Sequence, residues 1–475
     1  MSDSALFTDF YELTMAQGYW KHGLDTNAVF DVFFRRQPFQ GGYSVFAGLD
    51  PLLDSLQNLR FSGDDLAWLE RQGCFEPGFL KYLEGFRFSG DIYSVPEGET
   101  IFPQEPIMRL HGGLIEAQIV ESLVLNTINF QSLIATKSAR VTMAARDKKV
   151  LEFGLRRAQG RDGAMSATRA SYIGGVMSTS NALAAKELGI QASGTMAHSW
   201  VMAFPSELES FKAYAELYPD ATTLLIDTYD TIASGLPNAI TVGKMMAKKG
   251  KRIGVRLDSG DIDYLSRTVR AGLDKAGLRD ALIVVSNELD EEIIERLTIE
   301  GAPVDVWGVG TNLVTGGDEA SFSGVYKLAA VGRNGVLEPT MKFSDNPEKA
   351  TNPGVKELYR LYDESGAAIV DVMALEGEAL TEGKKFTFHH PSLDTRRFSY
   401  TPRGQIRKML EKVMANGKRV SPAAPMDQLR AQRIESMKSF DHTFLRFLNP
   451  HIYKVSISQG LRDLKLGFLE RYLGT

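Results

Sequence analysis

Short apolar runs alternate with amphipathic segments through the middle of the chain. The apolar runs predict buried strands at residues 150–153, 190–194, 223–227, 253–258, 282–286 and 304–308. Apolar positions spaced three or four residues apart predict helices at residues 176–188, 206–218, 238–249, 262–276 and 291–300. One strand and one helix recur about every 30 residues, the size of a βα unit. This rhythm favours an α/β fold with a parallel sheet, in the form of an irregular or incomplete βα barrel.

The regions on either side of this series have other patterns. The N-terminal region predicts strands at 28–34, 91–95 and 107–111 and a long helix at 114–146. In the last third, Asn334-Gly335 between two apolar runs predicts a hairpin, and a second hairpin is predicted across residues 364–366. The tail from about residue 425 is expected to be helical. Arginines and lysines between residues 396 and 419 are interpreted as a solvated face.

Composition narrows the class of protein. The 475 residues are 43% hydrophobic and 24% charged, an ordinary globular balance with room for two or three domains. A formal net charge of -5 gives no general attraction to nucleic acid or to an anionic membrane. The single cysteine, Cys74, permits neither an internal disulfide nor a cysteine-rich zinc site. The start lacks a signal-peptide pattern and the apolar stretch 114–136 carries two glutamates, so we expect a cytoplasmic protein without a membrane span.

Polar or glycine-rich segments follow all six predicted strands. In parallel βα folds, ligands bind at the carboxyl ends of the strands, so these segments are expected to form one site. A turn or a helix cap would explain any one of them, but not their shared location. In chain order they are FGLRRAQ (153–159), GTMAHS (194–199), DTYD (227–230), RLDSGD (256–261), SNELD (286–290) and GVGTN (308–312).

Two of these segments carry pairs of carboxylates. Asp227 and Asp258 are suited to hold a divalent metal or to polarise a hydroxyl. Asp230 and Asp261 are interpreted as helix N-caps. Arg256 lies two residues before Asp258, on the same face of an extended strand. It can pair with that aspartate or bind a substrate carboxylate through two hydrogen bonds.

Two further features have weaker signals. Gly308 and Gly310 let backbone N–H groups approach an anion, and Thr311 adds a hydroxyl donor, although a tight turn explains the segment equally well in isolation. The segment is neither a dinucleotide fingerprint nor a P-loop. His198 alone among seven histidines follows a predicted strand. Its neighbours favour a catalytic role over a structural one, and the absence of a second histidine nearby argues against a histidine-based metal site.

Together these segments resemble those of nicotinate phosphoribosyltransferases. The resemblance begins with TDFYELTMAQGY (8–19) and runs in order through EFGLRRAQ, GTMAHS, DTYDT, RLDSGD and GVGT to KFS (342–344) and KATNPG (349–354). It weakens after about residue 370. It implies that nicotinate and phosphoribosyl pyrophosphate give nicotinate mononucleotide and pyrophosphate, with ATP as co-substrate. It also implies a homodimer with shared active sites. Residues 1–140, completed by 345–475, would form an α+β domain beside a barrel-like catalytic domain at 141–344.

The resemblance assigns roles around the pyridine ring. Tyr11 would stack on the ring from the partner subunit, opposite Phe153. Arg156, Thr195 and Arg256 would surround nicotinate and the sugar phosphates.

It also assigns roles around the phosphates. Asp227 and Asp258 would bind ribose and Mg²⁺, while Gly310 and Thr311, with Gly308 beside them, would cradle phosphate. His198 matches the histidine that ATP phosphorylates. The cysteine-based zinc site that some relatives carry near the C-terminus is not possible with one cysteine.

Other functions stay open at this point. The loop at 174–181 offers hydroxyl and amide groups but no carboxylate, which suits nicotinate better than nicotinamide. Quinolinate, with two carboxylates, would call for a more basic pocket. A sugar-phosphate aldolase or isomerase barrel shares strand-end phosphate sites. A metabolite-binding regulator would leave the aspartates and His198 unexplained.

Overall fold

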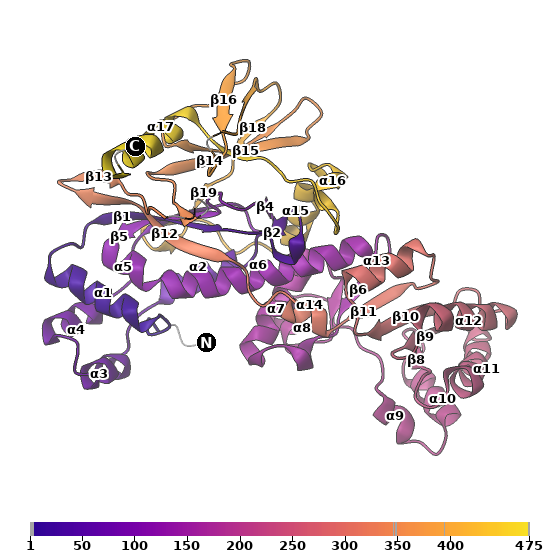
Figure 1. Cartoon of the computed structure of the whole chain (residues 1–475). Coiled ribbons are helices and arrows are strands. Elements are labelled where there is room, and N and C mark those ends of the chain that lie inside the picture. Colours follow the sequence, from indigo (N-terminus) through magenta and orange to yellow (C-terminus); the bar gives the residue numbers. More distant parts are fainter. Residues whose placement is uncertain (1–3, 345, 347–348, 394, 474–475) are drawn as a thin grey trace. The chain divides into compact units, whose positions relative to one another are not determined.

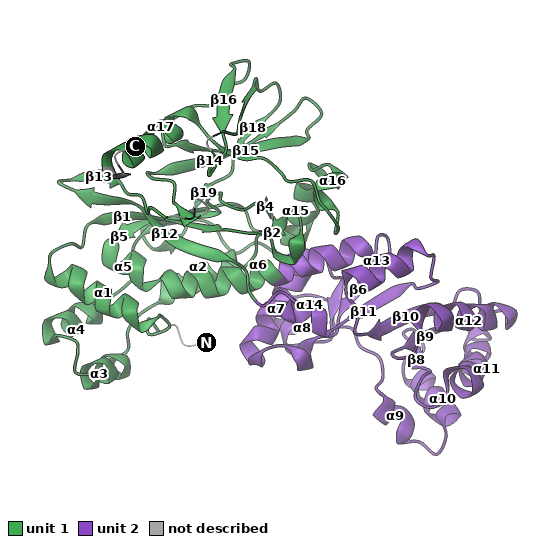
Figure 2. Ribbon diagram, in the orientation of Figure 1, with its two compact units in different colours: residues 1–133, 321–475 green, residues 134–320 purple. Residues whose placement is uncertain are grey.

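The computed structural model describes residues 4–344, 346, 349–393 and 395–473 (Figure 1). The chain divides into two compact units, Met1–Leu133 with Ser321–Thr475, and Ile134–Ala320 (Figure 2). The first boundary falls within the long helix α6 (Glu121–Ala144). Among the described residues, no helix combines the length and the apolar character needed to cross a membrane.

Unit 2 is built on a six-stranded parallel sheet. Its strands are β6 (Lys149–Glu152), β7 (Ser178–Thr179), β8 (Thr223–Leu225), β9 (Gly254–Leu257), β10 (Leu282–Asn287) and β11 (Val306–Val309). In the sheet order β7-β6-β11-β10-β9-β8, strands that are consecutive in the chain lie side by side, except β7 and β8, and the last strand, β11, also pairs with the first, β6. No described residues pair β7 with β8, so the ring stays open. This confirms the predicted incomplete barrel.

Helices follow most strands of unit 2. They are α7 (Gly160–Gly174), α8 (Ala182–Leu188), α9 (His198–Met202), α10 (Glu207–Leu217), α11 (Leu236–Ala247), α12 (Ile262–Lys275), α13 (Glu291–Ile299) and α14 (Thr311–Thr315), with one-turn segments η2 (Leu155–Arg157) and η3 (Thr231–Gly235). Asp230 caps η3 and Asp261 caps α12, each by accepting backbone N–H groups, as predicted.

The strand predicted at 190–194 is wrong. Residues 191–193 form only an isolated bridge to the sheet: the Gln191 carbonyl accepts the Thr179 N–H at 3.1 Å, and the Ser193 N–H donates to the Thr179 carbonyl at 2.8 Å. The strand that pairs with β6 at this edge of the sheet is β7, in which Ser178 pairs with Leu151 of β6. The helix predicted from residue 176 therefore begins only at Ala182 of α8, where the Asn181 side chain accepts the N–H of Ala184 at 3.2 Å.

Segments from both ends of the chain build the main sheet of unit 1. Its order is β13-β12-β1-β5-β3-β19-β20. The strands are β1 (Asn27–Phe34), β3 (Asp91–Ser94), β5 (Met108–Gly113), β12 (Gly324–Arg333), β13 (Val336–Pro339), β19 (Glu411–Ala415) and β20 (Lys418–Arg419). Asn334 and Gly335, at φ 52° and 79°, form the predicted hairpin turn between β12 and β13.

The N-terminal part of unit 1 is otherwise mainly helical. Its elements are α1 (Phe10–Lys21), η1 (Pro38–Gln40), α2 (Leu49–Asn58), α3 (Gly63–Arg71), α4 (Pro77–Glu84), α5 (Leu114–Ile119) and the small sheet of β2 (Ser44–Val45) and β4 (Thr100–Ile101). The helix predicted at 114–146 is interrupted at Val120, between α5 and α6.

A second sheet in unit 1 has the order β17-β16-β21-β15-β14-β18. Its strands are β14 (Lys356–Tyr362), β15 (Ala368–Leu375), β16 (Phe386–His389), β17 (Arg397–Tyr400), β18 (Ile406–Lys408) and β21 (Val455–Ile457). The hairpin between β14 and β15 is the second one predicted. The tail holds α15 (Met426–Lys438), α16 (His442–Leu445) and α17 (Gln459–Leu473). The expectation of a helical tail is wrong for β21, because its backbone pairs with β15.

Candidate active site

Arg256 of β9 connects three of the predicted strand-end segments. Its Nε donates to Ser286 Oγ at 2.8 Å, its Nη1 to Thr195 Oγ1 at 3.0 Å, and its Nη2 to Asp258 Oδ1 at 2.8 Å. The guanidinium is planar with N–H groups in fixed directions, so these contacts fix the positions of all three partners. The side chain is only 14% exposed. We call Arg256, Thr195, Asp258 and Ser286 the arginine cluster.

Asp258 is held as an ion. Its Oδ1 accepts hydrogen bonds from both Arg256 and Ser286, and its Oδ2 lies 3.8 Å from His198 Nε2. Burial alone would raise the pKa of Asp258. The hydrogen bond from Ser286 and the positive charge of Arg256 outweigh that effect, so the pKa lies below its ordinary value.

Asp227 has one carboxylate oxygen that is satisfied and one that is not. Its Oδ2 accepts the Asp258 N–H at 2.9 Å and the Ser259 hydroxyl at 2.6 Å. Its Oδ1 is buried and has no hydrogen-bond partner in the described part of the chain. Mg²⁺ is commonly held by one or two carboxylates together with water and substrate phosphates. The unpartnered Asp227 Oδ1 is an oxygen that could contribute to such a site, although the described residues contain no group of three or more His, Cys, Asp or Glu side chains able to hold a metal alone.

His198 begins α9 with one ring nitrogen held and the other facing the carboxylate. Its Nδ1 lies 3.1 Å from Thr228 Oγ1, and its Nε2 faces Asp258. The side chain is 42% exposed, so a substrate can reach the ring. An imidazole that is oriented by one partner and placed beside a carboxylate is suited to act as a nucleophile.

Phe153 follows β6 and lies against Gly308, near the end of β11. A Cβ atom on the buried Gly308 would lie 2.7 Å from the ring of Phe153, so only glycine leaves space for the ring. A Cβ on Gly310 would lie 3.4 Å from the Phe153 carbonyl oxygen, which is ordinary contact. The Arg256 guanidinium lies 5.7 Å from the centre of the Phe153 ring. Thr311 begins α14 and its hydroxyl donates to Glu288 at 3.4 Å.

Sequence reasoning missed several supporting residues. The buried Glu152 accepts hydrogen bonds from the Gly154 N–H and from the Thr168 and Thr179 hydroxyls, which holds the segment that carries Phe153. Ser286, Thr228 and Ser259 were also missed as site residues, although all three lie in or beside the polar segments. The signal was their position directly after a strand.

Two predicted site residues are not members of the arginine cluster. Arg156 on η2 is exposed and makes no hydrogen bond or ion pair with any described residue. Tyr11 belongs to α1 of unit 1, where it is 51% exposed. It lines a pocket of about 440 Å³ together with Phe7, which is 52% exposed, and Glu121.

Comparison with protein families gives matches along nearly the whole chain. The model described as the nicotinate phosphoribosyltransferase (NAPRTase) N-terminal domain matches residues 6–129. The model of the nicotinate phosphoribosyltransferase (NAPRTase) family matches residues 148–365, and that of the C-terminal domain matches residues 355–465.

Individual proteins agree with these matches. The chain is 45% identical to the nicotinate phosphoribosyltransferase of Bacillus subtilis (strain 168) over 389 residues, 82% of this chain and 79% of that protein. It is 33% identical to the human protein of that name over 518 residues, 97% of this chain and 95% of the human one. A crystal structure of human nicotinic acid phosphoribosyltransferase superposes with a TM-score of 0.84 at 30% identity, covering 97% of this chain and 99% of that one.

Proposed function

The chain belongs to the nicotinate phosphoribosyltransferase family, and we propose that the arginine cluster is where it carries out the family's reaction. The enzyme joins nicotinate to phosphoribosyl pyrophosphate, which gives nicotinate mononucleotide and pyrophosphate for NAD biosynthesis. The observation that carries the assignment is the contact of Arg256 with Thr195, Asp258 and Ser286 at the carboxyl ends of neighbouring strands.

The flat pyridine ring of nicotinate would bind over Phe153, with its carboxylate directed toward Arg256. The buried Glu152 holds the segment that carries Phe153 by accepting the Gly154 N–H, and the absence of a side chain at Gly308 leaves space for the ring. Stacking on an aromatic ring suits a planar heterocycle. A guanidinium that already bonds three side chains and the Met196 carbonyl is oriented before the substrate arrives, which lowers the cost of binding.

Transfer of the ribosyl group builds positive charge at the anomeric carbon while pyrophosphate leaves. The ionised Asp258 carries negative charge that stabilises this carbon, and it orients the ribose hydroxyls together with Asp227. Asp227 and Asp258 would also hold Mg²⁺, which neutralises charge on the departing pyrophosphate when bound. Gly310 and Thr311 would offer N–H and O–H donors to phosphate.

ATP hydrolysis would be coupled to the reaction through His198. A ring nitrogen attacks the γ-phosphorus of ATP, the bond to the bridging oxygen breaks, and ADP leaves. The phosphohistidine is later cleaved by water to histidine and phosphate. Support for this role comes from the exposed ring, the Thr228 contact and the carboxylate of Asp258 at 3.8 Å.

We further propose a cytoplasmic homodimer in which Tyr11 completes the partner subunit's site. Tyr11 and Phe7 are both about half exposed on the N-terminal segment of unit 1. Large exposed aromatic side chains of this kind are typical of interfaces. The exposed free thiol of Cys74 suits a reducing compartment.

Pyrophosphate release tests the substrate assignment. The enzyme is supplied with phosphoribosyl pyrophosphate and with nicotinate, nicotinamide or quinolinate in turn. We expect nicotinate to be used far better than the other two, since Arg256 is the cationic group in the cluster and the loop at 174–181 has no carboxylate to accept an amide N–H. Equal turnover of nicotinamide contradicts the assignment. Turnover of a sugar phosphate without phosphoribosyl pyrophosphate would favour an aldolase or isomerase.

A further inference from the structure

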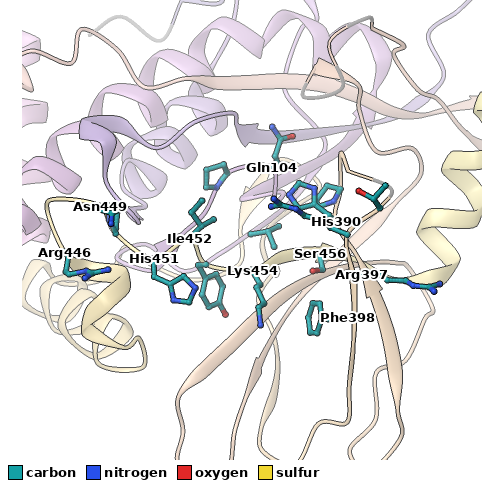
Figure 3. Close-up of a pocket in the computed structure, with 17 residues that line it drawn as sticks. Gln104, His390, Arg397, Phe398, Arg446, Asn449, His451, Ile452, Lys454 and Ser456 are labelled. Atoms are coloured by element: carbon teal, nitrogen blue, oxygen red, sulfur yellow. The ribbon is translucent and has the colours of Figure 1, made fainter.

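A second cavity, of about 940 Å³, lies in unit 1 (Figure 3). It is formed by the turn between β16 and β17, by the segment that leads from α16 into β21, and by Pro103 and Gln104. None of the residues of the arginine cluster lines it. The family's reaction therefore gives it no role.

Among the described residues that line this cavity, the charged side chains all carry positive charge. Arg396, Arg397, Arg446 and Lys454 line it, and none of the described lining residues is an aspartate or glutamate. In Figure 3, Arg446 lies on the left of the view, Lys454 in the middle and Arg397 on the right. The whole chain has a net charge of -5, so this concentration of positive charge runs against the overall balance. Like charges lining a concave surface focus the field and attract ions of the opposite sign.

Several basic side chains elsewhere in unit 1 have carboxylate partners. Arg407 bonds Glu99 at 2.9 Å, and Lys412 bonds Asp91 at 2.8 Å. Over the described ranges, none of the four cations of the cavity forms an ion pair. Arg446 makes only a 3.4 Å contact to a backbone carbonyl. The cavity therefore has unneutralised charge that an anionic ligand would satisfy.

His390 adds a neutral hydrogen-bond donor at the edge of the cavity. Its Nδ1 accepts the backbone N–H groups of Ser392 at 3.1 Å and Leu393 at 3.2 Å. Burial, together with the charges of Arg396 and Lys465, lowers the pKa of His390, so the ring is neutral near pH 7. With Nδ1 as acceptor, the proton of the neutral ring lies on Nε2, which makes Nε2 a donor.

Apolar groups complete the lining. The Phe398 ring lies under the Lys454 ammonium at 5.0 Å, which keeps that cation beside the cavity. Ile452 lines the cavity although 83% of its surface is exposed. An exposed isoleucine beside four cations provides a surface for the organic part of an anionic ligand.

We propose that this cavity binds a polyphosphate group, with Arg396, Arg397 and Lys454 on its phosphate oxygens. Several adjacent phosphates match four cations, whereas a single carboxylate would leave most of the positive charge unneutralised. A nucleoside diphosphate or triphosphate and inorganic polyphosphate share this chemistry. The volume of the cavity accommodates a nucleotide or an inorganic polyphosphate. Only the nucleotide has an organic part that could contact Ile452, so this contact distinguishes the two.

Calorimetric titration of the full chain with sodium tripolyphosphate and with ADP tests the proposal. The variant is Arg397→Gln with Lys454→Gln, and the matched control is Lys385→Gln with Arg403→Gln, which removes two exposed charges of unit 1 outside the cavity. We expect one class of sites to weaken about tenfold or more in the cavity variant only, because charge-assisted hydrogen bonds are lost. The arginine cluster is intact in every variant, so binding there and nicotinate turnover stay unchanged.

A third variant, Ile452→Ser, separates the two sources of polyphosphate. If it weakens ADP binding and leaves tripolyphosphate binding unchanged, the ligand is a nucleotide. If ADP binds the wild-type chain no better than tripolyphosphate does, and the Ile452→Ser substitution does not change ADP binding, the ligand is a free polyphosphate. The proposal is overturned if the cavity variant and the control give the same isotherms, or if neither probe binds the wild-type chain outside the arginine cluster. The substituted side chains are all exposed, so equal melting temperatures verify the fold.

Discussion

The two oxygens of Asp258 face different partners: Oδ1 accepts from Arg256 at 2.8 Å, and Oδ2 lies 3.8 Å from His198 Nε2. One carboxylate thus lies between the group proposed to bind nicotinate and the group proposed to accept phosphate. A negative charge added to His198 would repel Asp258 and alter its pairing with Arg256. This arrangement would give the proposed use of ATP a direct route to substrate affinity.

Replacing His198 tests that route. His198→Asn should abolish ATP hydrolysis and ATP stimulation while slow ATP-independent synthesis persists, because ribosyl transfer itself needs no phosphohistidine. Incorporation of label from γ-labelled ATP checks the result, with the exposed His442→Asn as control. Labelling of the His198 variant at the wild-type level would show that another residue is the acceptor.

Replacing Arg256 by lysine tests the arginine cluster. Lysine keeps the charge but cannot direct bonds to Thr195, Asp258 and Ser286 together. Each charge-assisted bond is worth roughly 1.5–3 kcal/mol, so kcat/KM for nicotinate should fall by at least about tenfold. Arg252→Lys, an exposed position just before β9, should leave steady-state kinetics unchanged. A fully active Arg256→Lys enzyme would remove the cluster from the proposed site.

Gly308→Ala should displace the Phe153 ring, because the new Cβ would lie 2.7 Å from it. We expect a raised KM for nicotinate together with a loss of stability of about 1–3 kcal/mol, as for other overpacked sites. Gly163→Ala in α7 is the control, since its Cβ meets nothing closer than 4.0 Å. Urea unfolding and steady-state kinetics measure both effects. An unchanged KM in a destabilised Gly308 variant would mean that Phe153 does not contact the substrate.

Glu121 predicts a pH dependence of stability in unit 1. Burial raises its pKa from 4.5 to about 7, and burial also raises the pKa of the neighbouring Glu12. Between pH 4.5 and 7 the folded chain keeps a proton that the unfolded chain has released, so stability falls as pH rises through this window. Glu121→Gln should remove that fall, for a gain on the order of 1–3 kcal/mol at pH 8 and little change at pH 4.5. Urea unfolding at both pH values checks this, with the exposed Glu70→Gln as control.

Subunit mixing tests the shared site. Tyr11→Ala and Asp258→Ala chains should each be nearly inactive. Hybrid dimers should regain part of the activity, because one of their two sites receives Tyr11 and Asp258 intact. Exchange of differently tagged subunits is verified first by affinity capture. A mixture that exchanges subunits and stays inactive would contradict the shared-site arrangement.

Five strands of unit 2 could be predicted because they are buried on both faces and read as continuous apolar runs. The short strand β7 could not, since Ser178 and Thr179 are polar; both are buried by pairing with β6, and the Thr179 hydroxyl also bonds Glu152. The run at residues 190–194 misled because Ile190 is buried directly after Gly189, which ends α8 at φ 66°. In so short a run, the sequence pattern of apolar residues buried at the end of a helix cannot be distinguished from that of a buried strand.

The site was predictable in its location but only partly in its contacts. Strand ends gather polar residues in any parallel βα fold, so Arg256, Asp227, Asp258 and His198 stood out. The bond from Arg256 to Ser286 depends on the register that pairs Arg256 with Val284, and neither strand encodes that register alone. Likewise, the fit of Phe153 against Gly308 depends on how β6 and β11 align.

The pairing of β1 with β12 has a consequence for synthesis on the ribosome. β1 lies inside its sheet, between β5 and β12, yet about 290 residues separate its end from the start of β12. At the usual rate of about 5–20 residues per second, that edge of β1 waits on the order of tens of seconds for its partner. All of unit 2 is translated in the meantime. The nascent chain therefore carries an open hydrophobic strand edge, the kind that chaperones bind and that aggregation exploits, until the second half of unit 1 emerges.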